Sequence, residues 1–176
     1  MTSRRAFLLV LGFAAVSACK PGAPKELKTQ DGRFSLTVPA DWVTATGLSE
    51  EASIQARNGE RYVTLTSIAR EDSRHPTIEA WAAARAEKVR SNFIEGKLSP
   101  AENVTVGDRT FVVYEVAGGY KDINVGAWLG FTQTATHYHQ IYAWTLKSEF
   151  PKAKDGLKKV ATSFGEPGAS GASSAK

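Results

Sequence analysis

Two histidines have the spacing in this chain that best suits metal chemistry. His137 and His139 sit two apart in a segment with the composition of a β-strand, so both side chains leave the same face of that strand. Two imidazoles so placed could fill two positions of a zinc or copper site. A third ligand has to come from elsewhere, and His75, Asp122 and Glu115 are the candidates. The alternative, which the lack of an adjacent third ligand favours, is a histidine pair on a solvated or cross-strand-paired face.

Aromatic side chains on the same strand suggest a second kind of site. Tyr138, Tyr142 and Trp144 share the face opposite to the histidines. Together they could line an apolar groove for a lipid tail or a partner helix. The competing interpretation, which we favour, places these rings in a sheet core beneath the helices.

Other catalytic patterns are missing from the sequence. No G-x-S-x-G elbow occurs, the carboxylates are scattered, and Gly118-Gly119 lacks the context of a phosphate-binding loop. The 22 Lys and Arg residues are spread among 18 Asp and Glu residues and form no block next to aromatic residues. Nucleic-acid binding is therefore not expected. We expect a protein that is not an enzyme and that uses no cofactor.

The single cysteine stands at a processing signal. Arg4 and Arg5 precede an uncharged apolar run, AFLLVLGFAAV, which is shorter than the about 20 residues that a membrane-spanning helix needs. The run ends at Val16-Ser17-Ala18-Cys19, which resembles the lipobox of bacterial lipoproteins. This resemblance implies a signal peptide over residues 1–18, cleavage between Ala18 and Cys19, and membrane attachment through lipidated Cys19. The alternative is an uncleaved anchor with an incidental cysteine.

Two further features concern the export route and the destination. The segment SRRAFL at residues 3–8 also resembles a twin-arginine signal. The strongly apolar run, with no basic residue before Cys19, favours the general secretory route instead. Lys20 stands where an aspartate would favour retention in the inner membrane. We therefore expect the periplasmic face of the outer membrane, provided that the host is Gram-negative.

The 176 residues divide into an anchor, one folded domain and a tail. Residues 19–30 are rich in turn formers and charge, and we interpret them as a lipidated tether. Residues 31–164 have the length and the apolar content of a single domain. Residues 165–176 (GEPGASGASSAK) are small and polar, and a disordered tail is predicted because they bury too little to offset their ordering entropy.

Alternating strands and two amphipathic helices predict an α+β domain. Strands are expected over residues 33–38, 52–57, 61–69, 103–106, 109–117, 125–134 and 136–147, with tight turns at Asn58-Gly59 and Gly107-Asp108. Helices are expected over residues 76–95 and 149–163, where apolar residues recur every three or four positions. This order predicts a central antiparallel β-sheet with helices packed on its faces.

Three segments of the domain carry a family resemblance. The sequence GRFSLTVPADW at residues 32–42 resembles the opening of PsbP-like domains, as do the long helix before the middle strands and the ending VATSF at residues 160–164. This superfamily includes the photosystem subunit PsbP, the Ran-binding Mog1 proteins and the bacterial lipoprotein DcrB. The resemblance implies an α/β/α sandwich and a mostly non-catalytic role. Its motifs are core and turn residues, so no functional residue is carried over.

These features together predict a non-enzymatic, lipid-anchored protein of the cell envelope. We expect it to act as an accessory or binding module through contacts with an envelope protein whose identity the sequence does not give. Two alternatives stay open. One is a carrier or chaperone for lipid or hydrophobic segments, and the other is a metal-binding protein that uses His137 and His139.

Overall fold

The structure is a computed structural model that describes residues 22–167. The predicted signal peptide, the predicted lipidation site at Cys19 and residues 168–176 of the predicted tail lie outside this range. No helix within the described range is long and apolar enough to cross a membrane.

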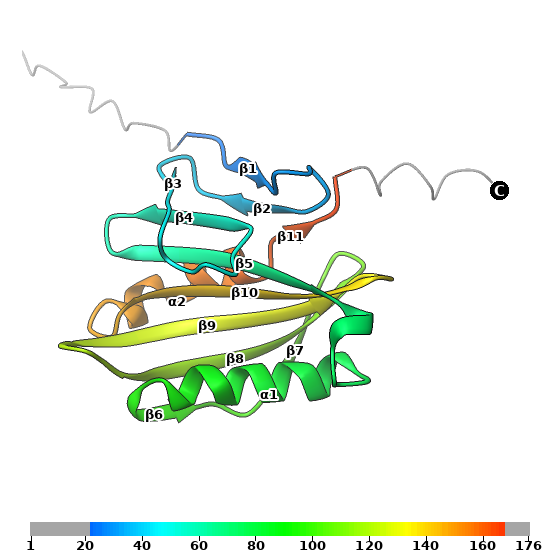
Figure 1. The fold of residues 1–176 in the computed structure, drawn as a ribbon. Coiled ribbons are helices and arrows are strands. Elements are labelled where there is room, and N and C mark those ends of the chain that lie inside the picture. Colours follow the sequence, from blue (N-terminus) through cyan, green and yellow to red (C-terminus); the bar gives the residue numbers. More distant parts are fainter. Residues whose placement is uncertain (1–21, 168–176) are drawn as a thin grey trace, which may run out of the picture.

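An eight-stranded antiparallel sheet forms the middle of the domain (Figure 1). Its strand order is β3-β4-β5-β10-β9-β8-β6, and β7 also pairs with β8. The strands are β3 (Val43–Thr44), β4 (Ile54–Asn58), β5 (Arg61–Ala69), β6 (Ile94–Leu98), β7 (Glu102–Val106), β8 (Arg109–Tyr120), β9 (Ile123–Gln133) and β10 (His137–Leu146). Strand β10, which carries both predicted sites, therefore lies near the centre of the sheet.

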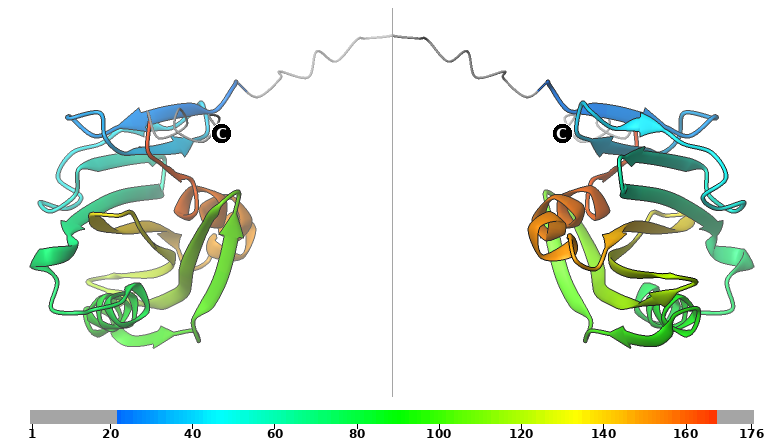
Figure 2. Two further views of the ribbon diagram at one scale, coloured as in Figure 1. Left: turned by 90° about the vertical axis from the view of Figure 1, so that its right-hand side faces the viewer. Right: turned by 90° about the vertical axis from the view of Figure 1, so that its left-hand side faces the viewer.

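Two helices cover opposite faces of this sheet (Figure 2). Helix α1 (Ile78–Ser91) begins at Thr77, whose side chain accepts a hydrogen bond from the Ala80 backbone amide. Helix α2 (Phe150–Ala161) has a proline in its first turn and buries Leu157 and Val160. A short 3₁₀ helix, η1 (Arg70–Asp72), follows β5.

A second, three-stranded sheet packs beside α2 on the same face. It has the order β1-β2-β11, with β1 (Lys25–Lys28), β2 (Ser35–Val38) and β11 (Phe164–Gly165). Its buried residues Phe34, Leu36 and Phe164 join the core that α2 forms with the large sheet. The main α1-side core is separate and includes Trp81, Leu129 and Tyr138.

The small sheet corrects both predicted boundaries of the domain. Residues 25–28 were expected in the tether, but they form β1 and pair with β2. Leu27 packs against the core, and the edge of β2 supplies backbone hydrogen-bond partners that no local pattern announces. Gly165 was expected in the tail, yet it belongs to β11, and Glu166 forms an ion pair of 2.9 Å with Arg109.

The remaining elements follow the sequence closely. The fold class is confirmed as a central antiparallel sheet with helices on both faces, and the turn at Gly107-Asp108 is confirmed by the pairing of Val106 with Arg109. In the other predicted turn, Asn58 still pairs with Arg61, so the turn residues are Gly59 and Glu60. Helix α1 ends at Ser91 instead of residue 95, because the chain turns there into β6, which the sequence did not predict.

Candidate functional site

His137 and His139 belong to an aromatic cluster between the large and the small sheet. Both rings lie on the α2-side face of β10 and are stacked, with centroids 6.0 Å apart. Phe34 contacts His139 with ring centroids 4.5 Å apart, and Phe164 does so at 4.2 Å. The guanidinium of Arg109 lies 4.8 Å from the Phe164 ring centroid. The two sheets are therefore joined at this end by histidine and phenylalanine rings.

His139 is fully buried within this cluster. Its Nδ1 lies 2.8 Å from the Ser67 hydroxyl, and its Nε2 lies 3.5 Å from the Thr134 hydroxyl. Burial, together with smaller contributions from the nearby His137 and Arg109, lowers the pKa of His139 to about 3. The imidazole is consequently neutral near pH 7, and hydroxyl groups face both of its nitrogens.

Among the described residues, the structure brings no third ligand to the predicted metal site. No group of three or more His, Cys, Asp or Glu side chains within residues 22–167 is arranged to hold a metal ion. His75 lines a surface pocket of about 520 Å³ together with His137, whereas Glu115 forms an ion pair with Lys154 on α2. Asp122 lies in the turn between β8 and β9, away from the histidines. Metal binding therefore stays a prediction without further support.

The Ser67–His139 pair resembles the beginning of a hydrolytic triad, since a serine hydroxyl next to an imidazole can be activated as a nucleophile. Two features oppose that role. A pKa of about 3 makes His139 a weak base, and its second nitrogen faces a threonine hydroxyl instead of a carboxylate. We interpret the pair as a structural hydrogen bond that satisfies a buried imidazole.

A surface pocket of about 760 Å³ opens beside the histidine cluster. It is lined by Phe34, His137 and Ser67 together with charged side chains of Asp31, Arg33 and Asp72. Arg33 and Asp31 are already paired at 2.5 Å, and the hydrogen bonds from Thr29 and Arg33 hold the pKa of Asp31 well below its usual range. The charges that line this pocket thus satisfy each other in part.

The three predicted groove residues divide between the core and the surface. All three point to the face of β10 opposite to the histidines, as predicted, and this is the face that α1 covers. Tyr138 is buried under α1, where its ring stacks on Trp81 with centroids 5.3 Å apart. Tyr142 and Trp144 are half-buried beside α1, which packs on β8, β9 and β6, and their ring centroids lie 4.6 Å apart. The core interpretation holds for Tyr138, whereas the other two rings reach the surface.

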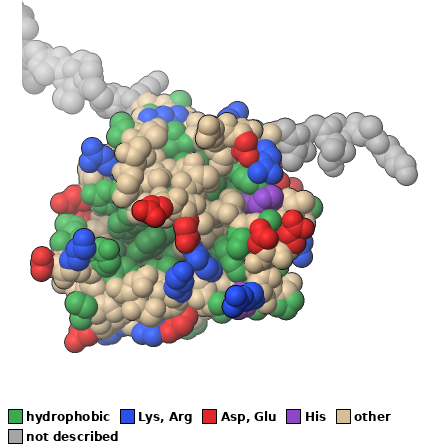
Figure 3. Space-filling view, in the orientation of Figure 1, with side chains coloured by type: hydrophobic (Ala, Val, Ile, Leu, Met, Phe, Trp, Pro, Cys, Tyr) green, Lys and Arg blue, Asp and Glu red, His purple; other side chains and the backbone are tan. Residues whose placement is uncertain are grey.

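Sequence reasoning missed Tyr62, the third member of the half-buried group. Tyr62 on β5 lies opposite Trp144 on β10, and their rings stack with centroids 5.2 Å apart. We call Tyr62, Trp144 and Tyr142 the aromatic shelf. Figure 3 shows hydrophobic side chains gathered in a hollow on this face, next to acidic and basic side chains. The signal for Tyr62 was the β5–β10 register, which a single sequence does not reveal.

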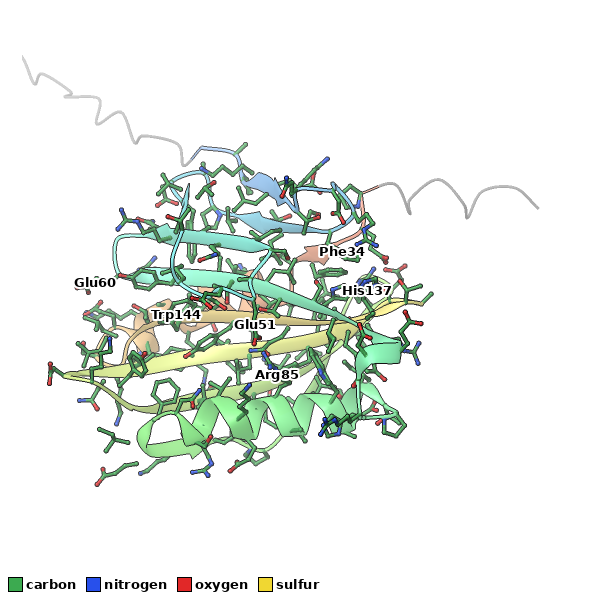
Figure 4. The ribbon with its side chains drawn as sticks, viewed as in Figure 1. Phe34, Glu51, Glu60, Arg85, His137 and Trp144 are labelled. Atoms are coloured by element: carbon green, nitrogen blue, oxygen red, sulfur yellow. The ribbon has the colours of Figure 1, made fainter. Side chains whose placement is uncertain are left out.

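A polar clamp borders the aromatic shelf. Arg85 on α1 donates a hydrogen bond of 2.8 Å from Nε to Gln140 Oε1, and its second amine lies 3.3 Å from the Glu51 carboxylate. Gln140 occupies the same face of β10 as Trp144, two positions before Tyr142. The labelled side chains of Glu51, Arg85 and Trp144 can be followed in Figure 4. The clamp thus connects α1 to β10 and to the loop before β4, and its side chains cover the sheet face next to the shelf.

Solved structures share this fold at low sequence identity. Cyanobacterial PsbP from Synechocystis aligns with a TM-score of 0.60 and 12% identity, over 89% of this chain and 98% of that chain. A Mog1 point mutant aligns with a TM-score of 0.53 and 14% identity, over 85% and 98% of the two chains. LpqN, involved in cell envelope biogenesis of Mycobacterium tuberculosis, aligns at 0.51 and 14% identity over 81% and 89%.

These similarities define the class of fold. No family model matches the sequence, and no curated protein matches it. The chain has a PsbP/Mog1-like α+β fold, as the resemblance at residues 32–42 and 160–164 implied. At such identities the similarity shows the fold alone, because one fold hosts many unrelated functions.

Proposed function

We propose that this chain is a lipid-anchored protein of the bacterial cell envelope that acts as a non-catalytic accessory or binding module through protein contacts. The observation that carries the binding role is the aromatic shelf. Tyr62, Trp144 and Tyr142 form a stacked row that stays half-buried where α1 leaves the sheet face open. Rigid aromatic rings in such a place bury a large apolar area on contact with a partner.

The anchoring part of the proposal rests on the sequence around Cys19. A basic start, an apolar run, two small residues and the sole cysteine occur in the order that lipoprotein processing requires. The similarity in fold to LpqN, which is involved in cell envelope biogenesis, supports an envelope role. The periplasmic face of the outer membrane is the proposed location, and Lys20 is the residue that favours it.

Site-specific photocrosslinking in intact cells tests the binding role. A photoreactive phenylalanine analogue at Tyr62 should capture an envelope protein, because this position lies on the shelf. The same analogue at Lys159, an exposed residue of α2 on the opposite face, is the matched control. Capture of the same products from both positions, or from Lys159 alone, would contradict a role for the shelf.

Metabolic labelling with a fatty acid tests the anchoring. The wild-type chain should incorporate the label and fractionate with membranes, whereas Cys19→Ala should remain unprocessed and unlabelled. If the Cys19→Ala protein still ran as the processed and labelled form, the lipobox interpretation would be wrong. Density-gradient separation of inner and outer membranes then tests the proposed location.

A carrier for lipid or hydrophobic segments is the second candidate function. The exposed apolar side chains of Tyr120 and Ile123 pair with each other at the end of β8 and β9 nearest the shelf, and burial, with a smaller contribution from Tyr120, raises the pKa of Tyr142. A carrier should co-purify with lipid that mass spectrometry detects, in an amount that Trp144→Ala reduces. Lipid-free protein that still yields crosslinks from position 62 would favour the binding module.

A further inference from the structure

Gly22, the first described residue, lies against the turn after β2, since a Cβ on Gly22 would be 2.8 Å from the Ala40 Cβ. Only Lys20 and Pro21 separate Gly22 from Cys19. Three residue steps of fully extended chain span at most about 11 Å. An acylated Cys19 would therefore hold the Gly22–Ala40 contact within about 11 Å of the bilayer surface.

This reach is short compared with the domain itself. A compact chain of this size has a radius of gyration of about 15 Å. The diameter of such a domain is more than twice its radius of gyration, and therefore more than three times the length of the tether. A domain held so closely does not present all faces to the bilayer equally. The face that carries Gly22 and Ala40 must stay next to the lipid.

The strand order defines the direction in which an anchored domain extends away from the bilayer. Strands β1, β2 and β3 lie at one end of the domain, and α1 and β6 lie at the other end in all three ribbon views (Figures 1 and 2). Strand β3 is one edge of the large sheet and β6 is the opposite edge. Neighbouring strands are about 4.8 Å apart, so the six steps from β3 to β6 correspond to about 29 Å before twist is considered.

We propose that the domain docks on the bilayer through the β2–β3 end, with β3 next to the lipid and β6 farthest from it. This inference rests on the proposed lipidation of Cys19. Val43 on β3 suits such contact, because it is a valine with 52% of its side-chain surface exposed. Arg57, its partner on β4, and Lys25, the partner of Val38, place positive charge at this end. The carboxylate of Glu26 on β1 is paired with Lys28, and that of Asp41 accepts a hydrogen bond from Asn58. Basic side chains next to an interfacial apolar residue favour an anionic lipid surface.

The orientation also places the aromatic shelf. The shelf lies on β5 and β10, two and three strands from β3, which corresponds to about 10–14 Å from the docked edge. At that height it faces sideways into the aqueous space instead of into lipid. A partner could thus reach the shelf while the domain stays docked.

Headgroup quenching on vesicles tests this orientation. Cys19 is the only cysteine, and acylation consumes its thiol, so an introduced cysteine would be the only free thiol for a fluorescent label. Val43→Cys on β3 and Ile94→Cys on β6 form a matched pair, because both positions are exposed apolar residues of edge strands, at 52% and 66%. The full-length lipidated protein is placed in phosphatidylcholine–phosphatidylglycerol vesicles that contain a nitroxide headgroup lipid.

The label at position 43 should be quenched at least threefold more than the label at position 94. A flexible Gly-Ser insertion of about twelve residues after Lys20 should bring the two values together, because it frees the domain to turn. Equal quenching at both positions in acylated, vesicle-bound protein would overturn the orientation and leave the anchoring intact. Protein without an acyl chain in mass spectrometry, and without binding to vesicles, would overturn both proposals.

Discussion

The Nδ1 atom of His139 lies 2.8 Å from the hydroxyl of Ser67, across the pairing of β10 with β5. The ring is fully buried between Phe34 and Phe164, and Arg109 and His137 are the positively charged or titratable groups that act on it. Proton uptake at this ring would place a charge in an apolar cluster. The cluster that joins the two sheets therefore requires a neutral imidazole.

The first prediction is that His139 makes the domain less stable in acid. Its pKa is about 3 in the folded state, whereas an unfolded histidine titrates near 6.5. The unfolded chain thus binds the proton first, so this contribution to stability is complete above about pH 6.5 and is lost as the pH falls toward 3. One such proton changes the unfolding free energy by about 1.4 kcal/mol per pH unit.

Urea unfolding at pH 7 and pH 4.5 measures this effect. His139→Gln should be less stable than wild type at pH 7, but its stability should fall less on acidification to pH 4.5, by about 2–3 kcal/mol. His75→Gln is the control, since His75 precedes α1 and lies outside the ring cluster. An unchanged pH dependence in His139→Gln would show that this ring is not the acid-sensitive group.

The second prediction concerns the two arms of the Arg85 clamp. Gln140 is only 5% exposed, so Arg85→Ala would leave a buried amide oxygen without its donor, at a cost of about 1–2 kcal/mol in unfolding free energy. Glu51 is largely exposed at 63%, and Glu51→Gln should cost less than about 0.5 kcal/mol. Chemical denaturation of both variants checks this order. Equal losses in the two variants would mean that the ion pair, not the buried amide, dominates the clamp.

The third prediction separates the aromatic shelf from the core below α1. Tyr138→Ala should destabilise the fold by about 3–5 kcal/mol, because the buried ring stacks on Trp81. Trp144→Ala removes a half-buried ring, so it should cost less stability while it abolishes crosslinking from position 62. Thermal unfolding and crosslink yield are measured on the same preparations. A folded Trp144→Ala protein with full crosslink yield would remove Trp144 from the binding surface.

The sequence predicted those elements of the fold whose apolar residues recur with the regular spacing of a strand or a helix. Strand β10 shows this best, because the alternation of residues 137–144 assigned the histidines and the aromatic residues to opposite faces, as observed. Strand β1 was not readable, because KELK contains one apolar residue and becomes a strand only when the edge of β2 supplies partners. Strand β6 was hidden in a helical pattern, in which Phe93 continued the apolar spacing of α1 past Ser91.

The candidate site could be predicted from the sequence only in part, because one of its rings lies on a different strand. Tyr142 and Trp144 were found because they share one strand, whereas Tyr62 joins them through a register between strands that lie far apart in the sequence. Helix α1 packs on β8, β6 and β9, so only Tyr138 of the three rings is covered, through its stacking on Trp81. The side-to-side position of α1 on the sheet depends on contacts between distant parts of the chain, so the sequence alone grouped Tyr138 with Tyr142 and Trp144.

The last prediction concerns the close approach of α2 to β9. Gly126 and Gly130 on β9 lie beneath this helix, and a Cβ on Gly130 would overlap the carbonyl oxygen of Ala161. Because that oxygen belongs to the helix backbone, a rotamer change does not relieve the overlap and the whole end of α2 must shift. Gly130→Ala should therefore lower the unfolding free energy by about 2 kcal/mol or more.

Gly156, on the helix that Gly130 contacts, is the control. It is exposed, and a Cβ there would meet no atom within 4 Å. Gly156→Ala should raise the unfolding free energy by about 0.5–1 kcal/mol, because alanine loses less backbone entropy than glycine when it enters a helix. A loss of unfolding free energy in Gly130→Ala and a gain in Gly156→Ala would show that the close contact between β9 and the α2 backbone fixes the position of the helix. Similar effects in both variants would instead show that α2 can move away from the sheet at little cost.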